Sequence, residues 1–109
     1  MYNKIIIFLF SVFFSDFSIP MVGFGTGGLA LEEPMRSAIR TALRTGYRLL
    51  DLAVMYHNEE IVRDVLREAD TPSRTSLFLT SKVWPTRLGY QETLEEVTGS
   101  LARLDTGYL

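Results

Sequence analysis

The chain has 109 residues, a net charge of −2, one histidine and no cysteine, and 47% of its residues are hydrophobic. This is the composition of a globular protein, and its scattered basic residues offer no electrostatic footprint for nucleic acid. The lack of cysteine excludes disulfides, thiolate nucleophiles and cysteine-based metal centres, and a single histidine excludes sites that need two imidazoles. We therefore expect no bound metal and no nucleic-acid partner.

Residues 1–17 form an apolar leader that contains the run IIIFLFSVFF at residues 5–14. The run is shorter than the roughly 20 apolar residues that span a bilayer, so we do not expect a membrane protein. It resembles the core of a signal peptide, but neither Ser15 nor Ser18 ends a small-residue cleavage pattern. A buried strand and a wrongly assigned first exon are the alternatives. We expect a cytoplasmic protein, with the secretory pathway as the alternative.

From Ser18 onward, short apolar runs alternate with amphipathic stretches, which predicts parallel strands joined by helices. The first strand leads into a glycine-rich turn at residues 25–28. The predicted strands are residues 19–24, 47–52 and 77–84, with a fourth beginning at Tyr108. The predicted helices begin near Pro34, after a cap at Asn58 and near Leu94, and the first of them ends at Gly46.

The predicted strands start about thirty residues apart, so one βα unit repeats along the chain. A (β/α)8 TIM barrel uses about 31 residues per unit, and an open doubly wound sheet has similar spacing. We favour the barrel because the chain stops inside an apolar run, whereas domain boundaries fall in exposed linkers. The expected fold is therefore α/β. Residues 18–109 would hold the first three βα units of a barrel domain and the start of its fourth strand.

Three polar residues fall at or just after the carboxyl ends of the predicted strands, where barrels place their active sites. Asp51 ends the second strand, Tyr56 lies in the following loop, and Lys82 lies near the end of the third. A phenol is a weak acid at neutral pH, and a nearby ammonium would stabilise its phenolate. Asp51 would pair with Lys82, because a partly desolvated cation needs a partner. We interpret the three as candidate catalytic residues for proton donation, although Asp51 alone could be a loop acid and Tyr56 alone a packing residue.

Four strings that cover most of the chain from Ser18 onward resemble the N-terminal part of an aldo-keto reductase. They are IPMVGFGTG at 19–27, AIRTALRTGYRLLDLAVMYHNEE at 38–60, LFLTSKVW at 77–84 and SLARLDTGYL at 100–109. The spacing of Asp51 and Tyr56, followed by the Thr-Ser-Lys string that ends at Lys82, is the most specific part. The resemblance implies a (β/α)8 barrel that binds NADPH and reduces aldehydes or ketones to alcohols, with Tyr56 as the proton donor.

The same resemblance implies roles for residues around these three. Gly25 and Thr26 match positions beside the nicotinamide end of the cofactor, and Asp51 is implied as a further cofactor contact. Trp84 matches an aromatic residue that lines the substrate pocket, although a place in the core is an equal alternative. The family implies a small-molecule carbonyl substrate and, for a completed barrel, a monomer.

The sequence departs from the family pattern at several points. Leu52 stands where a threonine commonly follows the aspartate, and Gly27 and Gly28 stand where an aromatic residue commonly follows the turn. The family's histidine on the fourth strand would lie beyond Leu109, and His57, which we expect to face solvent, does not replace it. The apolar leader takes the place of the family's N-terminal hairpin and does not resemble it.

Two functions therefore remain open. The first is an NADP-dependent oxidoreductase, of which this chain would be the N-terminal part, inactive by itself. The alternative is a non-catalytic barrel remnant, attached to membranes through its leader or acting as a cofactor-sensing regulatory subunit. Fewer than half the strands of a barrel cannot close it, so we expect the isolated chain to aggregate or to be molten.

Overall fold

The computed structural model describes residues 11–14, 17–28 and 31–109, with side-chain positions from residue 18 onward. Its centre is a parallel sheet in which the strand order β3, β4, β5 follows the chain. These strands are Phe24–Gly25, Leu49–Asp51 and Phe78–Thr80. The sheet confirms the predicted repeat of parallel βα units, although each strand is shorter than expected.

An antiparallel hairpin precedes the sheet. Strand β1 (Ser11–Phe14) pairs with β2 (Phe17–Pro20). The prediction of one strand over residues 19–24 was therefore wrong: its first two residues belong to the hairpin, and only Phe24 pairs with β4. Pro20 has no N–H to donate and lies at the end of the hairpin ladder, which is where a strand tolerates proline.

We expected the apolar leader not to resemble an N-terminal hairpin, and this expectation was wrong, because β1 lies within the leader and pairs with β2. The hairpin extends on both sides of the expected boundary at residue 17. Residues 1–10, with most of the leader, lie outside the described residues. The proposed division of the chain at residue 17 stays a prediction.

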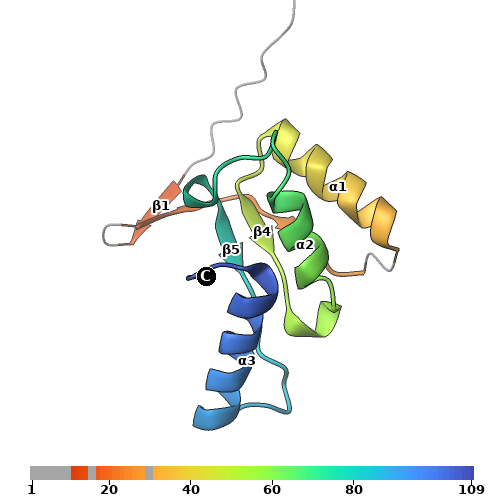
Figure 1. Cartoon of the computed structure of the whole chain (residues 1–109). Coiled ribbons are helices and arrows are strands. Elements are labelled where there is room, and N and C mark those ends of the chain that lie inside the picture. Colours follow the sequence, from red (N-terminus) through yellow and green to blue (C-terminus); the bar gives the residue numbers. More distant parts are fainter. Residues whose placement is uncertain (1–10, 15–16, 29–30) are drawn as a thin grey trace, which may run out of the picture.

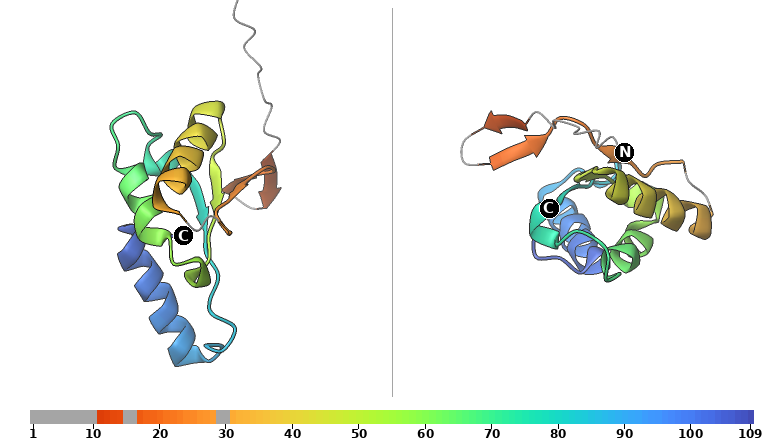
Figure 2. Two further views of the ribbon diagram at one scale, coloured as in Figure 1. Left: turned by 90° about the vertical axis from the view of Figure 1, so that its right-hand side faces the viewer. Right: turned by 90° about the horizontal axis from the view of Figure 1, so that it is seen from above.

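Three helices follow one another along one side of the sheet (Figures 1 and 2). They are α1 (Glu32–Thr45), α2 (Glu59–Leu66) and α3 (Tyr90–Leu104). Helix α1 ends as predicted at Gly46, whose φ of 106° is left-handed and whose N–H bonds back into the last turn. Helix α3 begins at Tyr90, four residues before the predicted start at Leu94, and Gly89 is its N-cap residue.

The core lies between this helical layer and the sheet. Its members are apolar side chains at helical spacing on α1 and α2, one residue of α3, and alternate residues in and directly beside β4 and β5. The buried cluster consists of Met35, Ile39, Leu43, Leu50, Leu52, Val62, Val65, Leu77, Leu79 and Leu104. This packing fixes the direction of β4 and β5, whose carboxyl ends carry the candidate site.

The expected start of a fourth strand does not pair in the described sheet. The carbonyl oxygen of Tyr108 accepts a hydrogen bond of 2.6 Å from Arg74. The Arg74 guanidinium also lies 3.9 Å from the centre of the Tyr108 ring.

In the part of the chain that the structure describes, no helix is long and apolar enough to cross a membrane.

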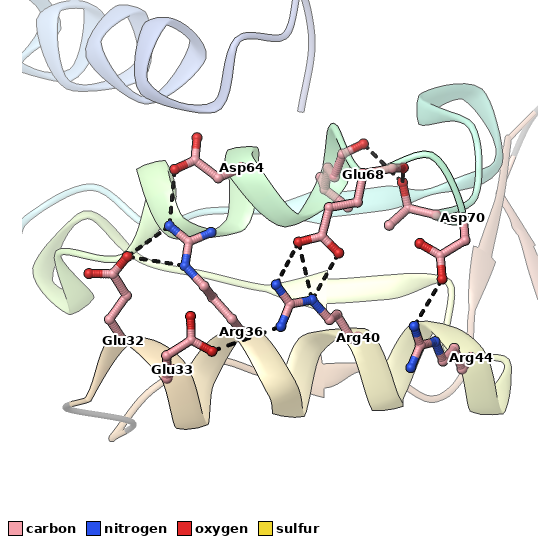
Figure 3. A network of polar contacts seen from close by, with 10 residues as sticks. Glu32, Glu33, Arg36, Arg40, Arg44, Asp64, Glu68 and Asp70 are labelled. Carbon is pink, nitrogen blue, oxygen red and sulfur yellow. Dashed lines mark hydrogen bonds and ion pairs between the residues drawn. The ribbon is translucent and has the colours of Figure 1, made fainter.

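A row of ion pairs joins α1 to α2 and the turn after it (Figure 3). Three arginines spaced four residues apart lie on one face of α1 and reach carboxylates 26 to 28 residues further along the chain. The pairs are Arg36 with Asp64 at 3.1 Å, Arg40 with Glu68 at 2.7 Å, and Arg44 with Asp70 at 2.9 Å. The middle pair is bidentate, because two guanidinium nitrogens of Arg40, Nε and Nη2, each donate to a different oxygen of the Glu68 carboxylate.

This pair gives a prediction about pH. The hydrogen bond from Arg40 holds the pKa of Glu68 below its usual range. Its contribution to stability is therefore present above the pKa of an unfolded glutamate and is lost as the pH falls through the folded pKa. We expect Glu68→Gln to lower the free energy of unfolding at neutral pH and to match the wild type once Glu68 is protonated. Urea unfolding of the complete barrel at neutral and acid pH measures this, with the exposed Glu60→Gln as the control; an equal deficit at both pH values would refute it.

Candidate active site

The carboxyl ends of β4 and β5 bring a carboxylate and an ammonium together. The segments after both strands leave the sheet at the same end of the molecule (Figure 1). The Lys82 Nζ donates to Oδ2 of Asp51 at 2.7 Å and to the carbonyl oxygen of Leu52 at 2.8 Å. The Thr80 hydroxyl donates to the other carboxylate oxygen, Oδ1, also at 2.7 Å. The predicted pairing of Asp51 with Lys82 is confirmed, and the carboxylate is held at both oxygens.

The backbone of Asp51 is fixed from the β3 side of the sheet. Its carbonyl oxygen accepts from the N–H of Thr26 at 3.0 Å and from the Thr26 hydroxyl at 3.2 Å. Thr26 is fully buried, and its own carbonyl accepts from the side-chain amide of Asn58 at 3.0 Å. The end of β4 is therefore hydrogen-bonded to the segments at the ends of both neighbouring strands.

Tyr56 lies beside this ion pair on a short 3₁₀ helix, η1 (Val54–Tyr56). The Lys82 Nζ is 5.2 Å from the centre of its ring. Gly27 permits the position of the ring, because a Cβ atom there would lie 3.0 Å from Cζ of Tyr56. The structure thus brings Asp51, Tyr56 and Lys82 into one cluster at the end of the sheet.

The ion pair changes the acidity of both its members. Partial burial raises the pKa of Asp51, but the hydrogen bonds from Lys82 and Thr80 lower it by more, so it stands below its usual range. Burial lowers the pKa of Lys82, but the hydrogen bond and charge of Asp51, together with Tyr56, outweigh burial and raise it. Lysine and aspartate are therefore both charged throughout the neutral range.

The remaining predicted site residues lie around this cluster. Gly25 pairs with Asp51 in the sheet and has open space where a Cβ would point. Trp84 is half-buried, with its ring centre 6.2 Å from that of His57. His57 is exposed, as predicted. Trp84 therefore lies near His57, the residue that follows Tyr56 in the sequence.

Sequence reasoning missed several supporting residues. Thr80 has the spacing that predicts its role, because residues 80 and 82 lie on one face of an extended segment. Asn58 was expected to cap α2, but its side chain makes no cap hydrogen bond and instead bonds Thr26. Glu59 is buried as well, although glutamate side chains are mostly exposed in folded proteins. Both exceptions depend on contacts across the fold, which a local helix pattern does not encode.

The site can be compared with what a metal or a nucleotide would need. Within the described residues, no group of three or more histidine, aspartate or glutamate side chains could hold a metal ion. A ligand that carries a hydroxyl group would fit better, because the Asp51 side chain is 42% exposed and can accept a further hydrogen bond. The bare backbone at Gly25 leaves room for a ligand beside it.

Comparison with known protein families identifies the family to which this chain belongs. The model of the aldo/keto reductase family matches residues 21–109, and the chain belongs to this family. It is 42% identical over 97 residues to the uncharacterised oxidoreductase YtbE of Bacillus subtilis. This alignment covers 84% of this chain and 34% of YtbE. It is 38% identical over 93 residues to the glyoxal reductase of the same organism. That alignment covers 84% of this chain and 33% of the glyoxal reductase.

Solved structures agree. An aldo/keto reductase from Brucella melitensis superimposes with a TM-score of 0.82 at 34% identity, covering 93% of this chain and 38% of that one. The Bombyx mori aldo-keto reductase in complex with NADP gives 0.76 at 30% identity, covering 84% and 33%. The predicted fold, part of a (β/α)8 barrel, is confirmed. The chain spans about a third of the length of the curated relatives it matches.

Proposed function

We propose that Asp51, Tyr56 and Lys82 form the proton-donating part of an NADPH-dependent reductase of aldehydes or ketones. The observation that supports this most is the Lys82 ammonium, bonded to Asp51 at 2.7 Å and lying beside the Tyr56 ring. An ammonium fixed beside a phenol stabilises the phenolate that forms when the hydroxyl proton leaves. Such a cluster suits a reaction in which negative charge develops on a carbonyl oxygen.

In the proposed reaction, Tyr56 donates its hydroxyl proton to the carbonyl oxygen of the substrate. NADPH, when bound, supplies the hydride that goes to the carbonyl carbon. Lys82 stabilises the phenolate left on Tyr56, and Asp51 keeps Lys82 charged and oriented. Solvent returns the proton to Tyr56 after the alcohol leaves, so the residues end the cycle unchanged.

The cofactor would lie at the carboxyl end of β3 and β4. Gly25 leaves space for it, and the half-exposed carboxylate of Asp51 can accept one of its hydroxyls. Thr26 supports this site indirectly, because its hydroxyl is bonded to the Asp51 carbonyl. We assign Trp84 to the wall of the substrate pocket, on the side of His57.

We further propose that these residues act within a complete barrel about three times as long as this chain, since the chain covers 34% of its relative YtbE. The other units of the barrel would supply the rest of the cofactor and substrate sites. Such a protein would act as a cytoplasmic monomer on small carbonyl compounds. The 109 residues alone would then be inactive.

The proposal is tested by following NADPH consumption by the complete barrel with glyoxal and with an aromatic aldehyde. We expect NADPH to be oxidised only when a carbonyl compound is present, with NADH as the comparison cofactor. A protein that binds NADPH without consuming it in the presence of any carbonyl compound would instead be a cofactor sensor. The intact mass of the native product gives a separate check, because a stable product of 12.4 kDa would contradict the complete barrel.

A further inference from the structure

Glu59, the first residue of α2, is buried although it carries a charge. Only 2% of its side chain is exposed. Its Oε1 accepts from the Ser81 hydroxyl at 2.8 Å, and its Oε2 accepts from Nε of Arg103 at 2.7 Å. A buried carboxylate is costly unless its oxygens are bonded, and here both of them are. The three residues form a connected chain from α3 through α2 to the segment after β5.

We propose that Glu59 is a positioning residue for Lys82, acting through Ser81. Its importance for catalysis rests on the function proposed above, whereas its effect on the position of Lys82 does not. Arg103 neutralises the carboxylate and orients it from α3. Glu59 in turn fixes Ser81, the residue immediately before Lys82.

The backbone around Lys82 explains why such an anchor is needed. Strand β5 ends at Thr80, so residues 81–84 lie outside the sheet. The carbonyl of Lys82 still accepts one hydrogen bond, from Val54 N–H at 3.2 Å. Side chains alternate along an extended segment, so Ser81 reaches α2 while Lys82 reaches Asp51. The Ser81–Glu59 bond therefore holds this segment from the side opposite the ion pair.

The neighbouring residue supports the same interpretation. Asn58 bonds the carbonyl of Thr26, and Thr26 holds the carbonyl of Asp51. Two consecutive residues at the start of α2 are thus linked to the segments that carry the two members of the ion pair. The start of this helix is therefore hydrogen-bonded to the segment after β3 and to the segment after β5.

The experiment uses Ser81→Ala and Glu59→Gln in the complete barrel. The titration of Lys82 is followed by NMR of its side chain, with its signal identified by its loss in Lys82→Arg. We expect both variants to bring the pKa of Lys82 closer to its ordinary value and to reduce kcat about 10- to 100-fold, the size of effect that misplacement by about 1 Å produces. The KM for the carbonyl substrate should change little.

Three controls make the result specific. Ser81→Ala keeps the charge of Glu59, so a shift in this variant is not a through-space effect of losing that charge. Ser81→Thr keeps the hydroxyl and should restore both the titration and kcat. Glu60→Gln loses the same charge from an exposed position in the same turn and should behave as the wild type.

The proposal is overturned if Ser81→Ala folds and both its Lys82 titration and its kcat match those of Glu60→Gln. Loss of folding in Glu59→Gln does not rescue it, because Ser81→Ala decides the outcome. Failure of the proposed function is a different result: Lys82 would shift as expected, but Tyr56→Phe would keep its reductase activity.

Discussion

Replacement of Tyr56 by phenylalanine is expected to lower kcat for carbonyl reduction by about 100- to 10,000-fold, the usual contribution of a general acid. The change removes one hydroxyl and keeps the ring that packs against Gly27. The ion pair beneath it, Asp51 with Lys82, is left in place. Affinity for NADPH should therefore be unchanged, as measured by quenching of protein fluorescence on titration with the cofactor.

Tyr90→Phe is the matched control, because Tyr90 is 88% exposed on α3 and loses the same hydroxyl. It should reduce the same aldehyde at the wild-type rate. Wild-type kcat in Tyr56→Phe would show that another group supplies the proton. A parallel loss of NADPH affinity would show that the hydroxyl acts in cofactor binding.

The second large effect is expected for Lys82→Met, which keeps much of the length of the side chain and removes its charge. We expect kcat to fall by about 100- to 1,000-fold, the typical cost of removing one preorganised donor from an active site. Removal of the ammonium also takes away the hydrogen bond that lowers the pKa of Asp51, so that pKa should rise.

The pH dependence of this pair has a defined sign. The folded pKa of Asp51 is lowered, so its contribution to stability is lost as the pH falls through that pKa. The folded pKa of Lys82 is raised, so its contribution is lost as the pH rises through that pKa. The wild-type pair should therefore be intact across the neutral range. Titration of the Asp51 carboxyl by NMR in both proteins measures the change, and an unaltered Asp51 pKa in Lys82→Met would contradict the pairing.

The parts of the fold that the sequence predicted are those that depend on local periodicity. The apolar stripe of α1 and its glycine stop at Gly46 encode a helix without help from the rest of the chain. The meeting of Asp51 with Lys82 was predictable for a different reason. Neighbouring parallel strands end at the same edge of the sheet. Lys82, near the end of one predicted apolar strand, and Asp51, at the end of the neighbouring one, are therefore expected to lie near each other.

The parts that the sequence did not predict depend on distant contacts. Residues 17–25 are apolar almost throughout, and nothing in their composition separates the hairpin from β3. The roles of Asn58 and Glu59 are set by partners 22 to 44 residues away, at Thr26, Ser81 and Arg103. An asparagine followed by a glutamate is typical of the start of a helix. This local pattern does not distinguish side chains that face solvent from side chains that are buried and bonded to distant segments.

The most direct test of the central claim uses NADPH that carries deuterium at its transferable position, together with an aromatic aldehyde and the complete barrel. We expect the alcohol product to carry one deuterium on the former carbonyl carbon, detected by mass spectrometry, and its formation to be at least about 100-fold slower in Tyr56→Phe. An unlabelled alcohol, or labelled alcohol formed by Tyr56→Phe at the wild-type rate, would contradict a reductase in which Tyr56, Lys82 and Asp51 supply the proton.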